Sequence, residues 1–143
     1  MTDAITMPTN LEGVRALLRT AGLPAGDLED ETPAWAVERD GETVGCVALE
    51  VYEANGFLRS LAVAPSARGD GLGSRLVEVV EDAARDLGLE AVYLLTTTAE
   101  RFFEARGYRR IDRAEAPESI RRSSEFVFSC SASARCLGKP LSP

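Results

Sequence analysis

The stretch Arg68-Gly69-Asp70-Gly71-Leu72-Gly73 has the residue types and spacing best suited to a chemical task. It follows a strand-like run at 57–63 and opens a helical pattern at 72–87. The first amides of a helix have no partner inside the helix, and the helix dipole adds partial positive charge there. Glycine lets a ligand approach the main chain, and arginine donates charge-assisted hydrogen bonds. The stretch therefore predicts a diphosphate site; the alternative is a plain connection between strand and helix, since the stretch is neither a Walker loop nor a G-x-G-x-x-G fingerprint.

The chain contains no histidine, which excludes Ser-His-Asp triads, Cys-His dyads and His-ligated zinc. Its three cysteines, Cys46, Cys130 and Cys136, lack Cys-x-x-Cys spacing, so we expect free thiols in a reducing cytoplasm and no metal site. On one strand, a spacing of six would place Cys130 and Cys136 about 20 Å apart. Buried structural thiols are therefore favoured over two ligands of one atom.

Length and charge narrow the class of protein. The 143 residues predict one domain over 1–143. A net charge of −7 argues against a nucleic-acid-binding face. No apolar run reaches the roughly 18 residues of a membrane span. The N-terminus lacks the pattern of a secretory signal, so we expect a cytoplasmic protein without a membrane partner.

Hydrophobic periodicity predicts the elements around the glycine stretch. We expect strands at 4–7, 34–39, 43–52, 57–63 and 91–95, and a final hairpin of 108–111 with 125–137. We expect helices at 11–21, 25–29, 72–87 and 99–106, and a polar loop at 112–124. Asp40-Gly41 and Asn55-Gly56 are two-residue hairpin signals. A helix joins strands 57–63 and 91–95, so this pair is parallel. These elements predict a mixed α/β sheet with helices on both faces.

The segment from Leu61 to Leu76 resembles the acetyl-CoA motif of the GNAT superfamily of N-acetyltransferases. That motif is Arg/Gln-x-x-Gly-x-Gly/Ala after a Leu-x-Val-x-Pro strand, and Arg68, Gly71 and Gly73 fill its three fixed places. Phe102 to Tyr108 resembles the second signature of the family, an aromatic-rich helix that ends in Gly-aromatic. The resemblance implies the GNAT fold, a mostly antiparallel mixed sheet flanked by helices, with a splayed parallel strand pair.

The resemblance also implies an activity, the transfer of an acetyl group from acetyl-CoA to a small amino-acid-like amine without a metal. The backbone of strand 61–63 would bind the pantetheine, and one of the amides of Leu61, Ala62 and Val63 would polarise the thioester carbonyl, with Ala62 as the catalytic candidate. The implied cofactor-binding residues are Leu61, Ala62, Val63, Arg68, Gly69, Asp70, Gly71, Leu72, Gly73, Ser74 and Phe103.

Proton transfer departs from the family pattern. Many members carry a tyrosine acid where this chain has Phe103, which cannot donate a proton. Because a thiol has a pKa near 8.5, the leaving group tolerates the absence of an acid. Tyr108, Thr98 or water are the alternative donors. Glu50 and Glu53, at the end of strand 43–52, are candidates for the general base; the alternative is that both are solvated charges.

The segment Leu95-Thr96-Thr97-Thr98 resembles part of the N-acetylglutamate synthases, in which an arginine stands where Thr98 stands here. That departure leaves glutamate open as the acceptor. Thr97 is our third catalytic candidate, with Glu50 and Ala62. The string 94–103 and the Cys-containing tail 128–133 resemble the N-acetyltransferases of arsenic-resistance operons, which implies a small acceptor amine that carries arsenic in one alternative.

Two other functions fit the sequence. A sensor module that binds acyl-CoA with little catalysis would explain Phe103, and an acetyltransferase of protein N-termini or lysines would use the acidic surface. Many GNAT proteins form homodimers through their C-terminal strands. The run Phe126-Val127-Phe128 is either such a dimer surface or part of the core.

Overall fold

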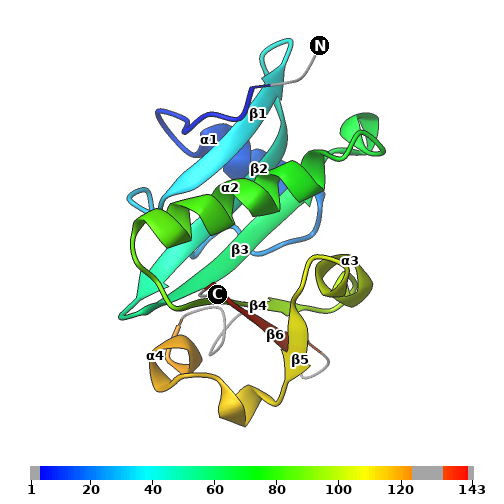
Figure 1. Cartoon of the computed structure of the whole chain (residues 1–143). Coiled ribbons are helices and arrows are strands. Elements are labelled where there is room, and N and C mark those ends of the chain that lie inside the picture. Colours follow the sequence, from blue (N-terminus) through cyan, green and yellow to red (C-terminus); the bar gives the residue numbers. More distant parts are fainter. Residues whose placement is uncertain (1–3, 124–133, 142–143) are drawn as a thin grey trace. The chain divides into compact units, whose positions relative to one another are not determined.

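The computed structural model describes residues 4–123 and 134–141. Within them, one sheet has the strand order β1-β2-β3-β4-β6-β5 (Figure 1). The strands are β1 (Ala34–Arg39), β2 (Glu42–Tyr52), β3 (Asn55–Val63), β4 (Ala91–Thr96), β5 (Arg109–Ile111) and β6 (Arg135–Pro140). The helices are α1 (Glu12–Thr20), α2 (Leu72–Asp86), α3 (Glu100–Glu104) and α4 (Glu118–Arg121), with 3-10 turns at Pro65–Ala67 and Arg113–Glu115. The predicted mixed, mostly antiparallel sheet with one parallel pair, β3 with β4, is confirmed.

The described residues fall into two compact units. The first contains the chain up to Leu49 together with Arg59–Val80, and the second contains Glu50–Leu58 and the chain from Glu81 onward. In the described part of the chain, no helix combines the length and the apolar character needed to cross a membrane.

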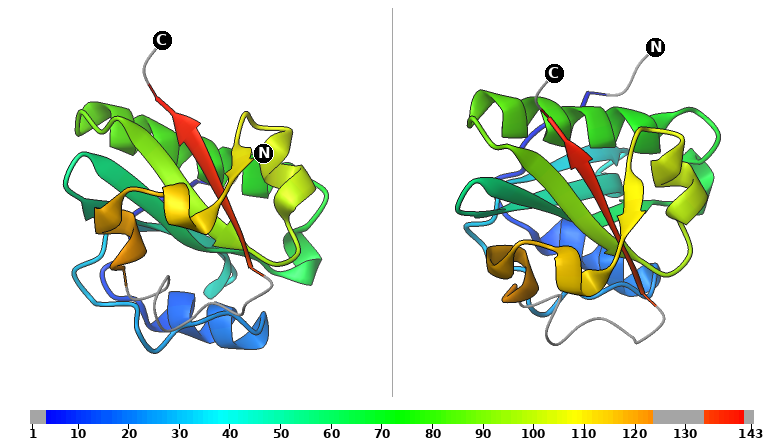
Figure 2. Two further views of the ribbon diagram at one scale, coloured as in Figure 1. Left: turned by 90° about the horizontal axis from the view of Figure 1, so that it is seen from below. Right: turned by 60° about the horizontal axis from the view of Figure 1, so that its bottom comes forward.

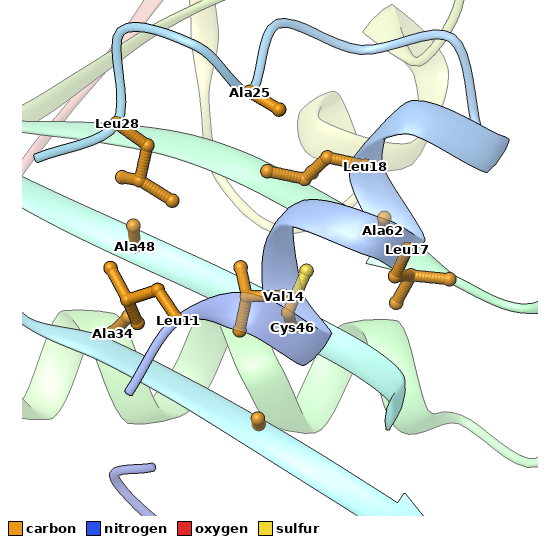
Figure 3. Packing of buried hydrophobic residues seen from close by; sticks show 11 residues of the cluster. Leu11, Val14, Leu17, Leu18, Ala25, Leu28, Ala34, Cys46, Ala48 and Ala62 are labelled. Atoms are coloured by element: carbon orange, nitrogen blue, oxygen red, sulfur yellow. The ribbon is translucent and has the colours of Figure 1, made fainter. Parts of the chain in front are cut away.

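The first unit is built around the alternation of side chains along β2. Cys46 and Ala48 face α1 and join a buried cluster with Val14 and Leu18 (Figure 3). Gly45 faces the opposite way, because a Cβ added there would lie 2.9 Å from Leu72 Cδ2 of α2. Successive side chains of a strand point to opposite faces of the sheet. The sheet of this unit is therefore covered by α1 on one face and by the first turns of α2 on the other.

In the second unit, β6 lies between β4 and β5 and runs antiparallel to both (Figure 2). Its Gly138 pairs with Tyr93 of β4, and a Cβ at this glycine would come within 2.8 Å of the tyrosine ring. Phe57, Ile120 and Cys136 form the buried cluster on which α4 packs. Glycine at 138 thus allows an aromatic ring to lie directly on the sheet.

Several predicted elements are confirmed. The strand at 34–39 has the predicted bounds, and the Asp40-Gly41 hairpin has two residues with positive φ, 53° and 82°. This geometry is the type I′ turn that suits twisted strands. Helix α2 ends at the predicted glycine, where the amide of Leu89 donates to the Ala84 carbonyl at 3.0 Å and Gly88 has φ 74°. Parallel β3 and β4 are likewise as predicted.

Other predictions about the elements are wrong. The expected first strand at 4–7 is reduced to one bridge, Thr6 with Ala36, and residues 25–29 form turns instead of a helix. The second hairpin turns two residues earlier than expected, at Glu53 (φ 58°), so that the Asn-Gly pair lies inside β3. The loop expected at 112–124 contains α4, and the final strand runs to Pro140.

Two residues in and just after α2 depart from a simple amphipathic pattern. Leu87, just beyond the helix, is 60% exposed, whereas the charged Glu81 is 6% exposed. Glu81 is compensated by Lys139 of β6, whose Nζ lies 3.1 Å from its Oε2. A charged partner on a distant strand overrides the helical pattern here. The predicted segment 126–128 and Cys130 lie outside the described residues.

Candidate active site

The glycine turn has the geometry of an open main-chain cradle. Gly69 and Gly71 have φ values of 92° and 77°, and a Cβ added to either would meet no atom within 4 Å. Positive φ of this size favours glycine, so the sequence requirement is conformational. The first bond of α2 joins the Arg75 amide to the Gly71 carbonyl at 3.1 Å. The amides of Leu72 and Gly73 therefore stand at the helix start, where no carbonyl of the helix precedes them.

Two side chains of the turn are tied to neighbouring elements. Arg68 Nε donates to the Val63 carbonyl at 3.1 Å, which places the guanidinium at the end of β3. The Asp70 carboxylate lies 3.6 Å from Arg39 of β1, so a cation faces the one acidic residue of the turn. Arg59, earlier in β3, is not available to the turn, because its side chain is fully buried and paired with Asp27.

β3 contains a kink just before the residues predicted to bind pantetheine. Ser60 has φ 61°, a left-handed conformation in the middle of a strand. Arg59 contacts Asp27, and Ala62 packs into the α1 cluster with Ala25 and Leu28 (Figure 3). Both therefore face the same side of the sheet at an odd spacing of three. A regular strand alternates with period two, so one extra residue, a bulge, lies between them.

The bulge determines which main-chain groups are turned away from β2. The Ala64 amide donates to Val44 of β2 at 2.8 Å, and the Ala62 amide faces the Cys46 sulfur of the same strand. Because neighbouring residues of a strand present their amides to opposite edges, those of Leu61 and Val63 point away from β2. The ladder of β3 with β4 pairs only Asn55–Phe57, so it ends before the bulge.

Cys46 lies at the centre of this kink. Its thiol donates to the Ser60 carbonyl at 3.2 Å and is inaccessible to solvent. Burial raises the pKa of the thiol to about 12, although the Ala62 amide acts in the opposite direction. The group is therefore a neutral hydrogen-bond donor at physiological pH and not a nucleophile.

The proposed general base, Glu50, lies near the end of β2. Its Oε1 accepts a hydrogen bond from the Tyr52 hydroxyl at 2.6 Å. The alternative, Glu53, is an exposed turn residue with positive φ, 58°. The tyrosine gives Glu50 a fixed orientation, and no such contact is seen for Glu53 within the described residues.

Phe103 and Tyr108 form an aromatic pair beside a buried charge. Phe103 is 4% exposed, and its ring meets Tyr108 edge-on at 5.5 Å. The Tyr108 hydroxyl lies beside Glu81, and burial, reinforced by this carboxylate, raises the pKa of the tyrosine far above its usual range. Lys139 Nζ completes the cluster with a 2.9 Å bond to the Arg106 carbonyl. A buried phenol of this kind is a poor acid, which argues against Tyr108 as the proton donor.

The threonines that follow β4 have different surroundings. Thr96 Oγ1 accepts the Ala99 amide at 3.0 Å and so organises the start of α3. Thr97 and Thr98 are exposed. On the neighbouring strand β6, Arg135 is paired in register with Thr96 of β4. Of Thr96 and Thr97, the predicted Thr97 is therefore the one whose hydroxyl is accessible, whereas Thr96 has a structural role.

A cavity of about 430 Å³ opens at the neighbouring ends of β5 and β6. Three arginines contribute to its lining, and the sequence did not indicate the cavity because Arg135 lies far in the chain from Arg110 and Arg113. Arg135 also forms an ion pair with Glu100 of α3 at 3.0 Å. The lining residues are Arg110, Ile111, Asp112, Arg113, Ala134, Arg135 and Cys136.

The sheet with its single parallel pair, followed by a glycine turn at the start of α2, is the fold of the GNAT acetyltransferases. The sequence agrees, because the model of the acetyltransferase (GNAT) family matches residues 8–108, more than half of the chain. The chain belongs to this family.

Sequence relatives include the amino-acid acetyltransferases of Ralstonia nicotianae, 40% identical over 88 residues, and of Neisseria meningitidis serogroup B, 36% identical over 88 residues. Each match covers 60% of this chain and 20% of the relative, so the chain spans about a fifth of the length of these relatives.

Two solved structures share the fold. N-acetylglutamate synthase from Neisseria gonorrhoeae, complexed with coenzyme A and N-acetyl-glutamate, has a TM-score of 0.79 at 24% identity over 100% of this chain and 36% of that one. Rv2747 from Mycobacterium tuberculosis, in complex with CoA, has a TM-score of 0.79 at 23% identity over 96% of this chain and 98% of that one.

Proposed function

We propose that this protein transfers the acetyl group of acetyl-CoA to the amine of a small amino-acid-like molecule. The observation that carries the proposal is the open glycine cradle at the start of α2, reached directly from β3. Glycines with left-handed φ and no neighbour at the Cβ position suit a diphosphate held by main-chain amides. Similarity to amino-acid acetyltransferases supports the same activity.

The chain supplies binding and polarisation by its main chain. Residues 69–74 would hold the diphosphate, with Arg68 adding a positive charge beside it. The amides of β3 beyond the bulge would donate to the pantetheine and to the thioester carbonyl. Ala62 is the catalytic candidate among the three residues of this strand, but its amide faces Cys46. Leu61 or Val63 would therefore supply the donor to the thioester carbonyl.

In the transfer, the neutral amine of the acceptor forms a bond to the acetyl carbon, and the carbon–sulfur bond breaks to release CoA as its thiolate, which then takes a proton from water. One proton must leave the amine. Glu50, oriented by Tyr52, is the proposed base or the anchor of a water relay. Thr97 would donate to or accept from the acceptor. No dedicated acid is needed, because thiols leave readily near neutral pH.

The arginine-lined cavity supports an acceptor that carries a carboxylate. Guanidinium groups bind carboxylates with paired hydrogen bonds. Arg110 forms no ion pair within the described part of the chain, and its neighbour Arg109 does not line the cavity. Arg110→Gln should raise the KM for a carboxylate acceptor at least fivefold without changing CoA affinity, whereas Arg109→Gln should change neither. Equal effects of the two variants would remove the cavity from the acceptor site.

The direct test of the proposed function is calorimetric titration with CoA, followed by a thiol-release assay with acetyl-CoA and a panel of amino acids and amines. We expect binding in the micromolar range and turnover with at least one amino acid. A correctly folded sample that shows no heat with millimolar CoA would refute the proposal.

A second candidate, a sensor that binds acyl-CoA with little catalysis, is favoured by one observation. Phe103 occupies the acid position, and it is packed between Phe102 and Tyr108. Turnover far above the uncatalysed rate with any amine in the panel would exclude this candidate.

Three finer features belong to the same proposal. The resemblance of 94–103 to enzymes of arsenic-resistance operons supports adding an arsenic-bearing amino acid to the panel. The buried thiols of Cys46 and Cys136, neither of which forms a disulfide within the described residues, fit a reducing cytoplasm. Dimerisation through the C-terminal strands would be seen as a doubled mass in light scattering.

A further inference from the structure

We propose that the buried residues Asp27, Arg59, Ser60 and Cys46 form a positioning network that holds the bulge of β3 in the conformation required for acetyl-CoA binding. The inference rests on the proposed function, because the bulge directly precedes Leu61–Val63. It adds four side chains, none of which touches the cosubstrate in this scheme, to a site otherwise made of main chain.

Arg59 is the centre of the network. Its side chain has no exposed surface, and its two terminal nitrogens donate to both oxygens of Asp27, at 2.8 and 2.9 Å. The Nε donates to Ser60 Oγ at 2.9 Å. A paired arginine–carboxylate contact fixes both position and angle. The connection between α1 and β1, which carries Asp27, is thereby attached to the residue just before the bulge.

Ser60 is held from two sides. Arg59 contacts its hydroxyl, and the Cys46 thiol of β2 donates to its carbonyl at 3.2 Å. At φ 61° this residue occupies a region that side chains other than glycine, asparagine and aspartate rarely adopt. Residues in such strained conformations persist only where their surroundings over-determine them. Ser60 thus adopts a positive φ, which is more common for glycine, while its hydroxyl accepts the hydrogen bond from Arg59.

The consequence of losing the bulge follows from strand geometry. If Ser60 relaxed to an extended conformation, the strand would return to period two, and the residues after it would exchange sides. The amides of Leu61 and Val63 would then turn toward β2. The network therefore controls the orientation of the Leu61 and Val63 amides. Losing that orientation should weaken CoA binding in a protein that is still folded.

A direct role of Arg59 in phosphate binding does not fit the structure. Its guanidinium is occupied by Asp27, and none of its surface reaches solvent. Arg15 offers a matched comparison in the same unit, since it joins α1 to the same connection through Asp30 at 2.7 Å. Within the part of the chain that the structure describes, Arg15 forms no hydrogen bond or ion pair with β3, so it links α1 to the connection without contacting the bulge.

The test uses the full chain with Arg59→Met, Ser60→Gly, both together, and Arg15→Met as the control. We expect Arg59→Met to weaken CoA binding at least tenfold by calorimetry at a temperature where all variants are folded. Ser60→Gly alone should bind within about twofold of the wild type, because glycine adopts positive φ without support. The double variant should recover to within about threefold, and Arg15→Met should be unchanged. If Arg59→Met weakened CoA binding only by destabilising the whole protein, adding Ser60→Gly would not be expected to restore the affinity.

A readout independent of the ligand separates this inference from the proposed function. In ¹H–¹⁵N spectra, the amide signals of Leu61–Val63 should shift in Arg59→Met and return toward the wild-type positions in the double variant. If the wild type failed to bind CoA, the proposed function would fall and these spectra would still test the network. Unshifted signals in Arg59→Met, or a double variant no better than the single one, would overturn the inference.

Discussion

Replacing Gly71 by glutamate tests whether the turn before α2 holds a diphosphate. The residue has φ 77°, and a Cβ there would meet no atom within 4 Å. The fold therefore accommodates a side chain sterically, and the left-handed conformation costs about 1–2 kcal/mol for a residue other than glycine. For a protein of this size, that loss lowers the Tm by about 3–8 °C.

The effect on binding is separate and larger. Two like charges about 4 Å apart repel by about 1 kcal/mol in water and about 4 kcal/mol at an effective dielectric constant near 20. Since about 1.4 kcal/mol is a factor of ten, the Kd for CoA should rise between about fivefold and several hundredfold. Titration calorimetry at 15–20 °C, with the folded fraction checked by circular dichroism, measures this change.

Two controls isolate the charge and the location. Gly71→Gln has nearly the same size and backbone strain without the charge, so its affinity should lie between those of the wild type and the glutamate variant. Gly22→Glu introduces the same charge at φ 74°, also with an open Cβ position, at the end of α1. It should lose stability and keep its CoA affinity. Wild-type affinity in a folded Gly71→Glu protein would show that the turn is only a connection.

Three further predictions concern the core. The pKa of Cys46 is higher in the folded than in the unfolded state, so its contribution to stability should be complete below about pH 9 and fall as the pH rises toward 12. In urea titrations, the stability of Cys46→Val should therefore decline less steeply at alkaline pH than that of the wild type. Identical curves for the two proteins would contradict the assignment. Lys139→Met leaves Glu81 buried without its partner and should cost about 3–5 kcal/mol, most of it recovered in the double variant with Glu81→Gln, which a double-mutant cycle measures. Gly45→Val forces a Cβ against Leu72 and should cost about 1–3 kcal/mol by urea unfolding; a neutral result would mean that α2 shifts freely.

Local signals in the sequence were sufficient for much of the fold. Asp40-Gly41 gave its hairpin correctly, because a two-residue type I′ turn depends on those two residues alone. Asn55-Gly56 carries the same signal and is wrong, because the pairing of the flanking strands places the turn at Glu53 instead. A hairpin signal is thus decided by register, which a single segment does not contain.

The candidate site divides in the same way. The glycine turn was found because its backbone requirement is written in adjacent residues. The burial of Arg59 could not be predicted in this way, since nothing near it in the sequence shows that Asp27, far away in the chain, neutralises it. The odd spacing of Arg59 and Ala62 on one face was a local signal available in principle: a charged residue within an apolar strand indicates a bulge or a buried partner. Arg135 joins Arg110 and Arg113 at the cavity only through the pairing of β5 with β6.

The bulge at Ser60 divides β3 into two segments, and the alternation of side chains between the two faces of the sheet is shifted by one residue from the first segment to the second. Removing a single residue there would do more than shorten the strand. Every residue between Ser60 and the 3-10 turn would then face the opposite side of the sheet. The number of residues in this segment therefore matters as much as their type, and one alanine inserted beside Ser60 should reverse the orientation of the residues that follow it.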